Sequence, residues 1–223
     1  MRRLNAEDHA VVSGAIAAAE ANSDGEIVAI ASDQSDAYHD VGLHYAVLAG
    51  FLVLALLAAA PHLLTGLHDA LVGWSAVPSL REVLTLAFML TLAGFLIALF
   101  AMKWTPLRMA LTPGATKTRR VRRRAIMLFK TGAERRTVGR TGILIYLSLA
   151  EHRAEIVADE AITSVTTPET WGEAMTALLT HVKAGRQGEG IAAAATLIGE
   201  VLATHFPKSA HDTNEIPDKL IEL

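Results

Sequence analysis

Two long runs of uncharged, apolar residues constrain this chain more than any other feature of its sequence. The first run extends from Tyr45 to Leu64, and the second extends from Val83 to Met102. Because an α-helix rises about 1.5 Å per residue, about 20 residues of this kind cross the roughly 30 Å hydrocarbon layer of a membrane. Tyr45 and Trp104 stand at the ends of the runs, where aromatic rings favour the membrane interface. We therefore predict a transmembrane hairpin over residues 43–104, in preference to two buried helices of a soluble core.

The distribution of cations predicts how this hairpin is oriented. The link from Pro61 to Glu82 contains Arg81 as its only lysine or arginine. Many cations follow the second run instead: Lys103, Arg108, Lys117, Arg119, Arg120, Arg122, Arg123, Arg124 and Lys130. Since cytoplasmic flanks carry the excess of lysine and arginine, the chain is expected to be a multi-pass inner-membrane protein with both termini in the cytoplasm.

The two cytoplasmic segments, 1–40 and 115–223, are expected to form one domain. The first has an N-capped helix up to about Asn22 and a strand from Glu26 to Ala31, too little for an independent core. The second has a strand pattern at 141–149, a return strand at 154–159 and two apolar helical stripes after Thr167. We therefore predict an α/β domain with a small sheet of three or four strands, covered by helices and interrupted by the hairpin.

Carboxylates at strand ends are the candidate metal ligands. Asp33 and Asp36 follow the first strand, at the end of the sheet where α/β proteins usually bind ligands. Asp159 and Glu160 end another strand, which places them either near the first pair or at the opposite edge. Oxygen ligands of this kind suit Mg²⁺ or Ca²⁺. The alternative interpretation is that they are ordinary loop and capping residues.

Familiar catalytic motifs are missing from the sequence. There is no cysteine, which excludes disulfides, thiolate nucleophiles and cysteine-bound metals. There is no Gly-x-Ser-x-Gly elbow and no His-Glu-x-x-His motif. Asp33 and Asp36 are spaced three apart, whereas an aspartyl-phosphate motif needs a spacing of two. These absences favour a binding function over catalysis.

A basic run follows the hairpin and is expected to be helical. It contains Lys117, Arg119, Arg120, Arg122, Arg123 and Arg124. Next to a membrane such cations attract anionic lipid headgroups, at about 1 kcal/mol each. Nucleic-acid binding would require interleaved aromatic residues, and only Phe129 is near, so no nucleic-acid partner is expected. Arg140, further along, is a candidate contact for an anion or a partner.

Several stretches of the second segment resemble the TPM domain family, in its bacterial membrane-anchored subgroup. The resemblance lies in the residue runs 139–146 and 149–159, in Trp171, in 190–191 and 205–207, and in the tail 212–218. It implies a three-layer α/β/α sandwich, usually tethered to a membrane. Members are linked to phosphatase activity, to divalent-cation binding and to the assembly of membrane complexes. This chain departs from the family where Glu160-Ala161-Ile162 replaces an expected Gly-Tyr-Gly stretch.

Together these observations lead to two functional hypotheses. The first is a membrane-anchored cytoplasmic module that binds or helps to assemble other membrane proteins or copies of itself, with a Mg²⁺ or Ca²⁺ site as an additional expectation. The alternative is a divalent-metal-dependent phosphatase acting at the same strand ends.

Overall fold

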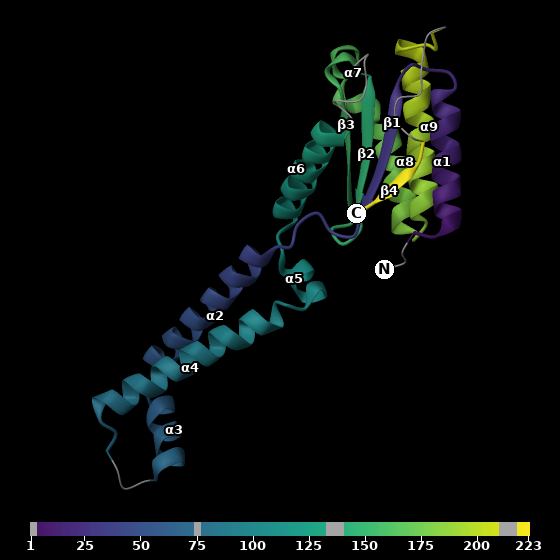
Figure 1. Ribbon diagram of the computed structural model, residues 1–223. Coiled ribbons are helices and arrows are strands. Elements are labelled where there is room, and N and C mark those ends of the chain that lie inside the picture. The colour runs from purple at the N-terminus through teal and green to yellow at the C-terminus, as the bar shows by residue number, and fades with distance from the viewer. Residues whose placement is uncertain (1–3, 74–76, 133–140, 210–217) are drawn as a thin grey trace. The chain divides into compact units, whose positions relative to one another are not determined.

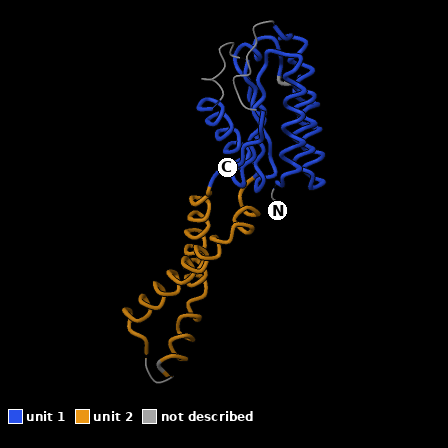
Figure 2. Tube along the Cα trace, turned by 45° about the vertical axis from the view of Figure 1, so that its right-hand side comes forward, with its two compact units in different colours: residues 1–36, 114–223 blue, residues 37–113 orange. Residues whose placement is uncertain are grey.

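The computed structural model describes residues 4–73, 77–132, 141–209 and 218–223. The chain divides into two compact units (Figure 2). The first contains residues 1–36 and 114–223, and the second contains residues 37–113. The segments before and after the apolar runs thus belong to one unit.

A four-stranded mixed sheet forms the centre of the first unit (Figure 1). Its strands are β1 (Glu26–Ser32), β2 (Gly142–Ser148), β3 (Arg153–Ala158) and β4 (Leu220–Glu222). They lie in the order β3-β2-β1-β4. β1 runs parallel to both β2 and β4, and β2 pairs with β3 as an antiparallel hairpin. The short strand β4 was not predicted, because three residues carry little pattern.

Helices cover both faces of this sheet, which makes the unit a three-layer structure. One face is covered by α1 (Ala6–Glu20), α8 (Gly172–Lys183) and α9 (Gln187–His205), and the other by α6 (Gly114–Gly132). The connection from β3 to α8 contains α7 (Glu160–Val165) and the 3₁₀ turn η1 (Pro168–Trp171).

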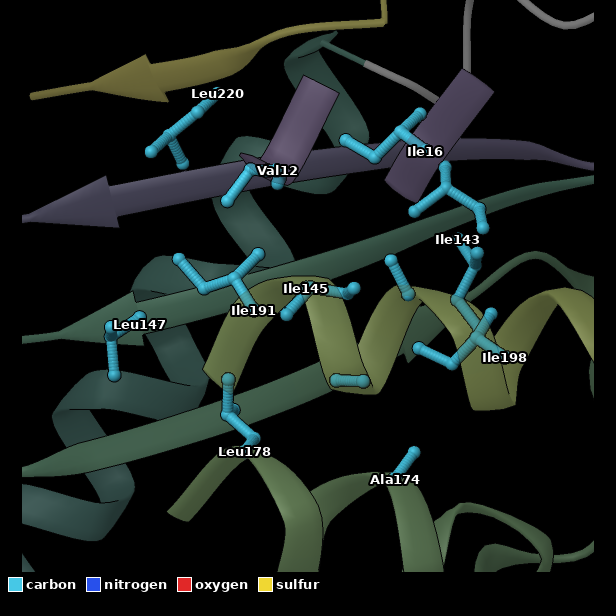
Figure 3. Packing of buried hydrophobic residues seen from close by; sticks show 14 of the residues in the cluster. Val12, Ile16, Ile143, Ile145, Leu147, Ala174, Leu178, Ile191, Ile198 and Leu220 are labelled. Atoms are coloured by element: carbon cyan, nitrogen blue, oxygen red, sulfur yellow. The ribbon is translucent and has the colours of Figure 1, made fainter. Parts of the chain in front are cut away.

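The alternation of side chains along the strands divides the core between the two faces. Ile143, Ile145 and Leu147 of β2 point toward α8 and α9, where they meet Leu178 and Ile198 (Figure 3). The intervening residues pack under α6, which contributes its own buried stripe: Leu144 and Tyr146 from β2, and Val121, Ala125 and Phe129 from α6. Both central strands are buried along their full length, as the apolar run at 141–149 predicts.

The second unit consists of helices, of which two are long and apolar enough to cross a membrane. Its elements are α2 (His39–Ala59), α3 (His62–Val72), α4 (Leu80–Ala101) and α5 (Thr105–Leu111). α2 has 21 residues and α4 has 22. The first apolar run was predicted to continue to Leu64, but α2 ends at Ala59 and Pro61 caps the separate helix α3. Proline lacks the N–H that a continuing helix needs, which explains the break.

Candidate functional site

The carboxyl ends of β1 and β2 lie side by side, and the predicted residues Asp33 and Asp36 follow β1 there. Ser32 is paired with Ser148 at the end of the parallel ladder. The Asp33 side chain is exposed. The Asp36 carboxylate lies 2.9 Å from Nη1 of Arg120, a residue of α6. A cation from the predicted basic run therefore neutralises one of the predicted metal ligands.

A buried polar network holds this loop to β2. The Ser35 hydroxyl lies 2.7 Å from the Ser148 hydroxyl and 2.9 Å from the Tyr146 hydroxyl. Glu151, in the β2–β3 turn, accepts from the Ser35 N–H at 3.0 Å and from the Ser148 hydroxyl at 2.6 Å. Both Glu151 oxygens thus accept hydrogen bonds that tie two loops together. This arrangement ties the loop after β1 to the β2–β3 turn through the Glu151 carboxylate.

No pattern in the sequence predicts this network. Ser148 and Glu151 are buried, at 0% and 5% exposure. The only sequence signal for these two residues is a polar residue that ends an otherwise apolar strand and is followed by an acid in the turn. That signal is weak, because exposed turns have the same composition.

A shallow pocket opens beside Asp33. Its volume is about 430 Å³, and it is lined by Leu4, Ala31, Ser32, Asp33, Leu149, Glu222 and Leu223. The end of β4 reaches this pocket because the Asp33 N–H donates to the Leu223 carbonyl at 3.2 Å. His9 Nε2 lies 2.6 Å from a Glu222 oxygen at its rim. The pocket therefore presents both acidic and apolar groups to a binding partner.

Asp159 lies at the opposite end of the sheet, so it cannot share an ion with Asp33 and Asp36. It follows β3, whose last residue Ala158 pairs with Ile143 at the start of β2. A strand rises about 3.3 Å per residue, so the length of β2 separates the two ends. Asp159 is buried and accepts from the Gly142 N–H at 3.0 Å. The sequence left two positions open for Asp159, and the structure shows the one at the opposite edge of the sheet.

The same end of the sheet holds Glu20, a buried carboxyl that was not predicted from the sequence. Burial raises its pKa to about 8, against the opposing effect of the Ile27 N–H, which donates to Oε1 at 2.6 Å. The Glu26 and Asp218 carboxylates raise this pKa further. In the ionised form of Glu20, the Oε2 atom receives no hydrogen bond from the described residues. In the protonated form, the Glu20 carboxyl can donate to Asp218. Perturbed carboxyls of this kind are candidates for functional sites.

The remaining predicted site residues lie on or near α6. Its exposed or half-exposed cations include Lys117, Arg119, Arg120, Arg122, Arg123 and Arg124. Arg120 is engaged with Asp36, so it is not directed only at lipid. Arg140 lies outside the described residues. Among the residues that are described, no three histidine or carboxylate side chains are placed to hold a metal ion.

Comparison with known proteins supports the fold and leaves the activity open. No protein-family model matches this chain, and no curated protein matches it. It is similar to a structure determined by NMR, that of the BA42 protein from the psychrophilic bacterium Bizionia argentinensis. The TM-score is 0.57 at 17% sequence identity, covering 100% of this chain and 97% of the other. At this identity the likeness concerns the fold alone.

Proposed function

We propose that this protein is a membrane-anchored cytoplasmic binding module of the TPM type. The observation that carries this proposal is the exposed apolar surface of α2 and α4. Phe51 is 66% exposed and Ile97 is 70% exposed. Exposed apolar surface of this extent is unfavourable in water and favourable in a bilayer. The two helices would anchor the α/β unit, whose chain they interrupt between β1 and α6.

The proposed orientation places the α/β unit in the cytoplasm of a bacterium and the α2–α4 link outside the inner membrane. The cations of α6 follow the second apolar helix and would contact anionic lipid headgroups. Other membrane proteins, or further copies of this chain, are the proposed partners.

The proposed binding surface is the carboxyl end of β1, with Asp33, the Asp36–Arg120 pair and the adjoining pocket. Its rigidity supports this proposal, because Ser35, Ser148 and Glu151 hold the loop through hydrogen bonds of 2.6–3.0 Å. Mg²⁺ or Ca²⁺ would reach Asp33, and would have to compete with Arg120 for Asp36. The phosphatase alternative gains no support from the described residues.

Cysteine labelling tests the anchoring directly, because the natural chain contains no cysteine. The matched variants Thr65→Cys and Thr118→Cys place one exposed thiol each on α3 and α6. In intact bacterial cells whose outer membrane has been made permeable, a membrane-impermeant maleimide should label the first variant and not the second. Equal labelling of both in intact cells, or release of the protein from membranes by alkaline carbonate, would overturn the proposal.

Calorimetric titration of the detergent-solubilised chain with MgCl₂ and CaCl₂ tests the metal expectation. Binding that is lost in the Asp33→Ala/Asp36→Ala double variant and kept in Glu173→Ala would locate an ion at this surface and justify a phosphatase screen. If no binding is seen at millimolar metal, both the ion site and the phosphatase hypothesis are ruled out, and a metal-independent binding module is left.

A further inference from the structure

Strand β3 presents a backbone edge that no described strand covers. It is the outer strand of the sheet (Figure 1), and the Asp159 N–H donates to the Gly142 carbonyl at 2.9 Å. Because hydrogen-bonded pairs alternate along an antiparallel ladder, this bond fixes the direction of the preceding backbone groups. The N–H and C=O groups of Ala154, Ile156 and Ala158 point away from β2. No strand within the described part of the chain pairs with them.

A groove of about 670 Å³ follows this edge. Its lining includes Glu155 and Val157, which face α6, and also Ile156 and Ala158, which face α8. Since residues from both faces of one strand line the same groove, the groove runs along the edge itself.

The two walls of the groove differ in chemistry. The α8 side presents Trp171 and Met175, which form an apolar wall. The α6 side presents Ile126 and the exposed guanidinium of Arg122. Arg119 lies one turn before Arg122 on α6 and adds to the positive charge of that helix. An extended peptide can present different side chains to the two walls, because its successive side chains point to opposite sides.

Glu155 is the acidic group of the groove. Its burial raises its pKa, and the nearby Arg122 and Arg153 act in the opposite direction. The two guanidinium groups outnumber this one carboxyl, so the charge around it is positive on balance. The groove therefore favours a ligand that carries negative charge on its α6 side.

We propose that β3 binds an extended, acidic segment of a partner protein by strand addition. Alternate apolar side chains of that segment would pack on Trp171 and Met175, and its carboxylates would lie opposite Arg122. The outward groups of Ala154, Ile156 and Ala158 would continue the ladder. This inference rests on the proposed binding function, for which it specifies a second surface and the chemistry of the partner.

A simpler explanation is a protected edge. Charged side chains on an outer strand, such as Arg153 and Glu155, discourage pairing with other chains. The two explanations differ in whether a peptide of the right pattern binds with saturation.

The test uses the full chain in detergent micelles and two fluorescein-labelled peptides, Val-Glu-Val-Glu-Val-Glu-Val and Val-Lys-Val-Lys-Val-Lys-Val. Fluorescence anisotropy, corrected with protein-free micelles, should show saturable binding of the glutamate peptide and at least tenfold weaker binding of the lysine peptide. Arg122→Glu should weaken binding of the glutamate peptide at least tenfold and strengthen binding of the lysine peptide. The control Arg123→Glu, an exposed residue of α6 outside the groove lining, should change both by less than twofold.

Ala158→Pro tests the backbone contribution, because proline removes an outward N–H that β2 does not use. This variant should bind the glutamate peptide at least fivefold more weakly, and its thermal unfolding should remain cooperative. If the variant does not fold, the comparison of the Arg122 and Arg123 variants decides the test. No saturable binding, or equal losses in the Arg122 and Arg123 variants, would overturn the groove proposal. The cysteine-labelling result is independent of these outcomes, so failure of the groove is distinguishable from failure of the membrane-anchoring proposal.

Discussion

At the scale of single residues, the buried carboxyl of Glu20 has the clearest consequence for stability. It is 7% exposed, and its pKa is raised to about 8 from 4.5. The folded chain therefore keeps this proton to higher pH than the unfolded chain does. The resulting stabilisation is fully present below pH 4.5 and is lost as the pH rises toward 8 and above.

Glu20→Gln should abolish this pH dependence. The amide cannot ionise, and it can still donate a hydrogen bond toward Asp218. Each pKa unit corresponds to about 1.4 kcal/mol, so between pH 5 and 8 the natural chain should lose a few kcal/mol of unfolding free energy that the variant keeps. Thermal unfolding in detergent, followed by circular dichroism at both pH values, measures the difference. The exposed control Glu200→Gln should follow the natural chain; if Glu20→Gln does so as well, the buried-acid explanation is wrong.

At the scale of elements, the packing of α1 against α9 depends on a glycine. A Cβ atom added at Gly199 would lie 2.5 Å from the Cβ atom of Ala19 and 2.9 Å from its Cα atom. Such distances are far inside van der Waals contact, so the two helices would have to move apart. A Cβ atom at Gly14, on the outer side of α1, would meet nothing within 4 Å.

The matched substitutions Gly199→Ala and Gly14→Ala should therefore have opposite effects. Gly199→Ala should destabilise the fold by about 1–3 kcal/mol through overpacking. Gly14→Ala should stabilise it by up to about 1 kcal/mol, because alanine favours the helix. Denaturant unfolding of both variants provides the comparison. A Gly199→Ala chain as stable as the natural one would show that the helices are packed less closely than described.

At the scale of the whole molecule, the α/β unit has its own core and should fold without the hairpin. Residues 1–36 and 114–223 form one compact unit. The ion pair between Asp36 and Arg120 brings the ends of its two segments close, since Arg120 lies within two turns of the start of α6. A short flexible linker can therefore replace residues 37–113.

Replacing residues 37–113 with a Gly/Ser linker of about ten residues should give a water-soluble, cooperatively folding protein. The apolar surface of α2 and α4 is then gone, so the variant should remain in the supernatant after ultracentrifugation while the full chain sediments with membranes. Gel filtration and thermal unfolding without detergent would check the fold. Aggregation of the variant would indicate that the α/β unit needs the hairpin for its stability.

The sequence by itself determined those features that arise from local pattern. The two apolar helices follow from uninterrupted hydrophobic composition, and the fully apolar run at 141–149 predicted the buried strand β2. The start of α1 was also predictable, because Asn5 and Asp8 form a capping box within four residues. The mixed α/β class followed from the order of these patterns.

Only the tertiary structure decided which distant residues meet. Strand direction and order placed Asp159 at the end of the sheet opposite Asp33, which no spacing in the sequence could show. The engagement of Asp36 by Arg120 and the perturbation of Glu20 depend on packing between segments far apart in the chain. The physical reason is that periodicity reports which face of an element is buried, whereas the partner across that face is chosen by the packing of the whole core.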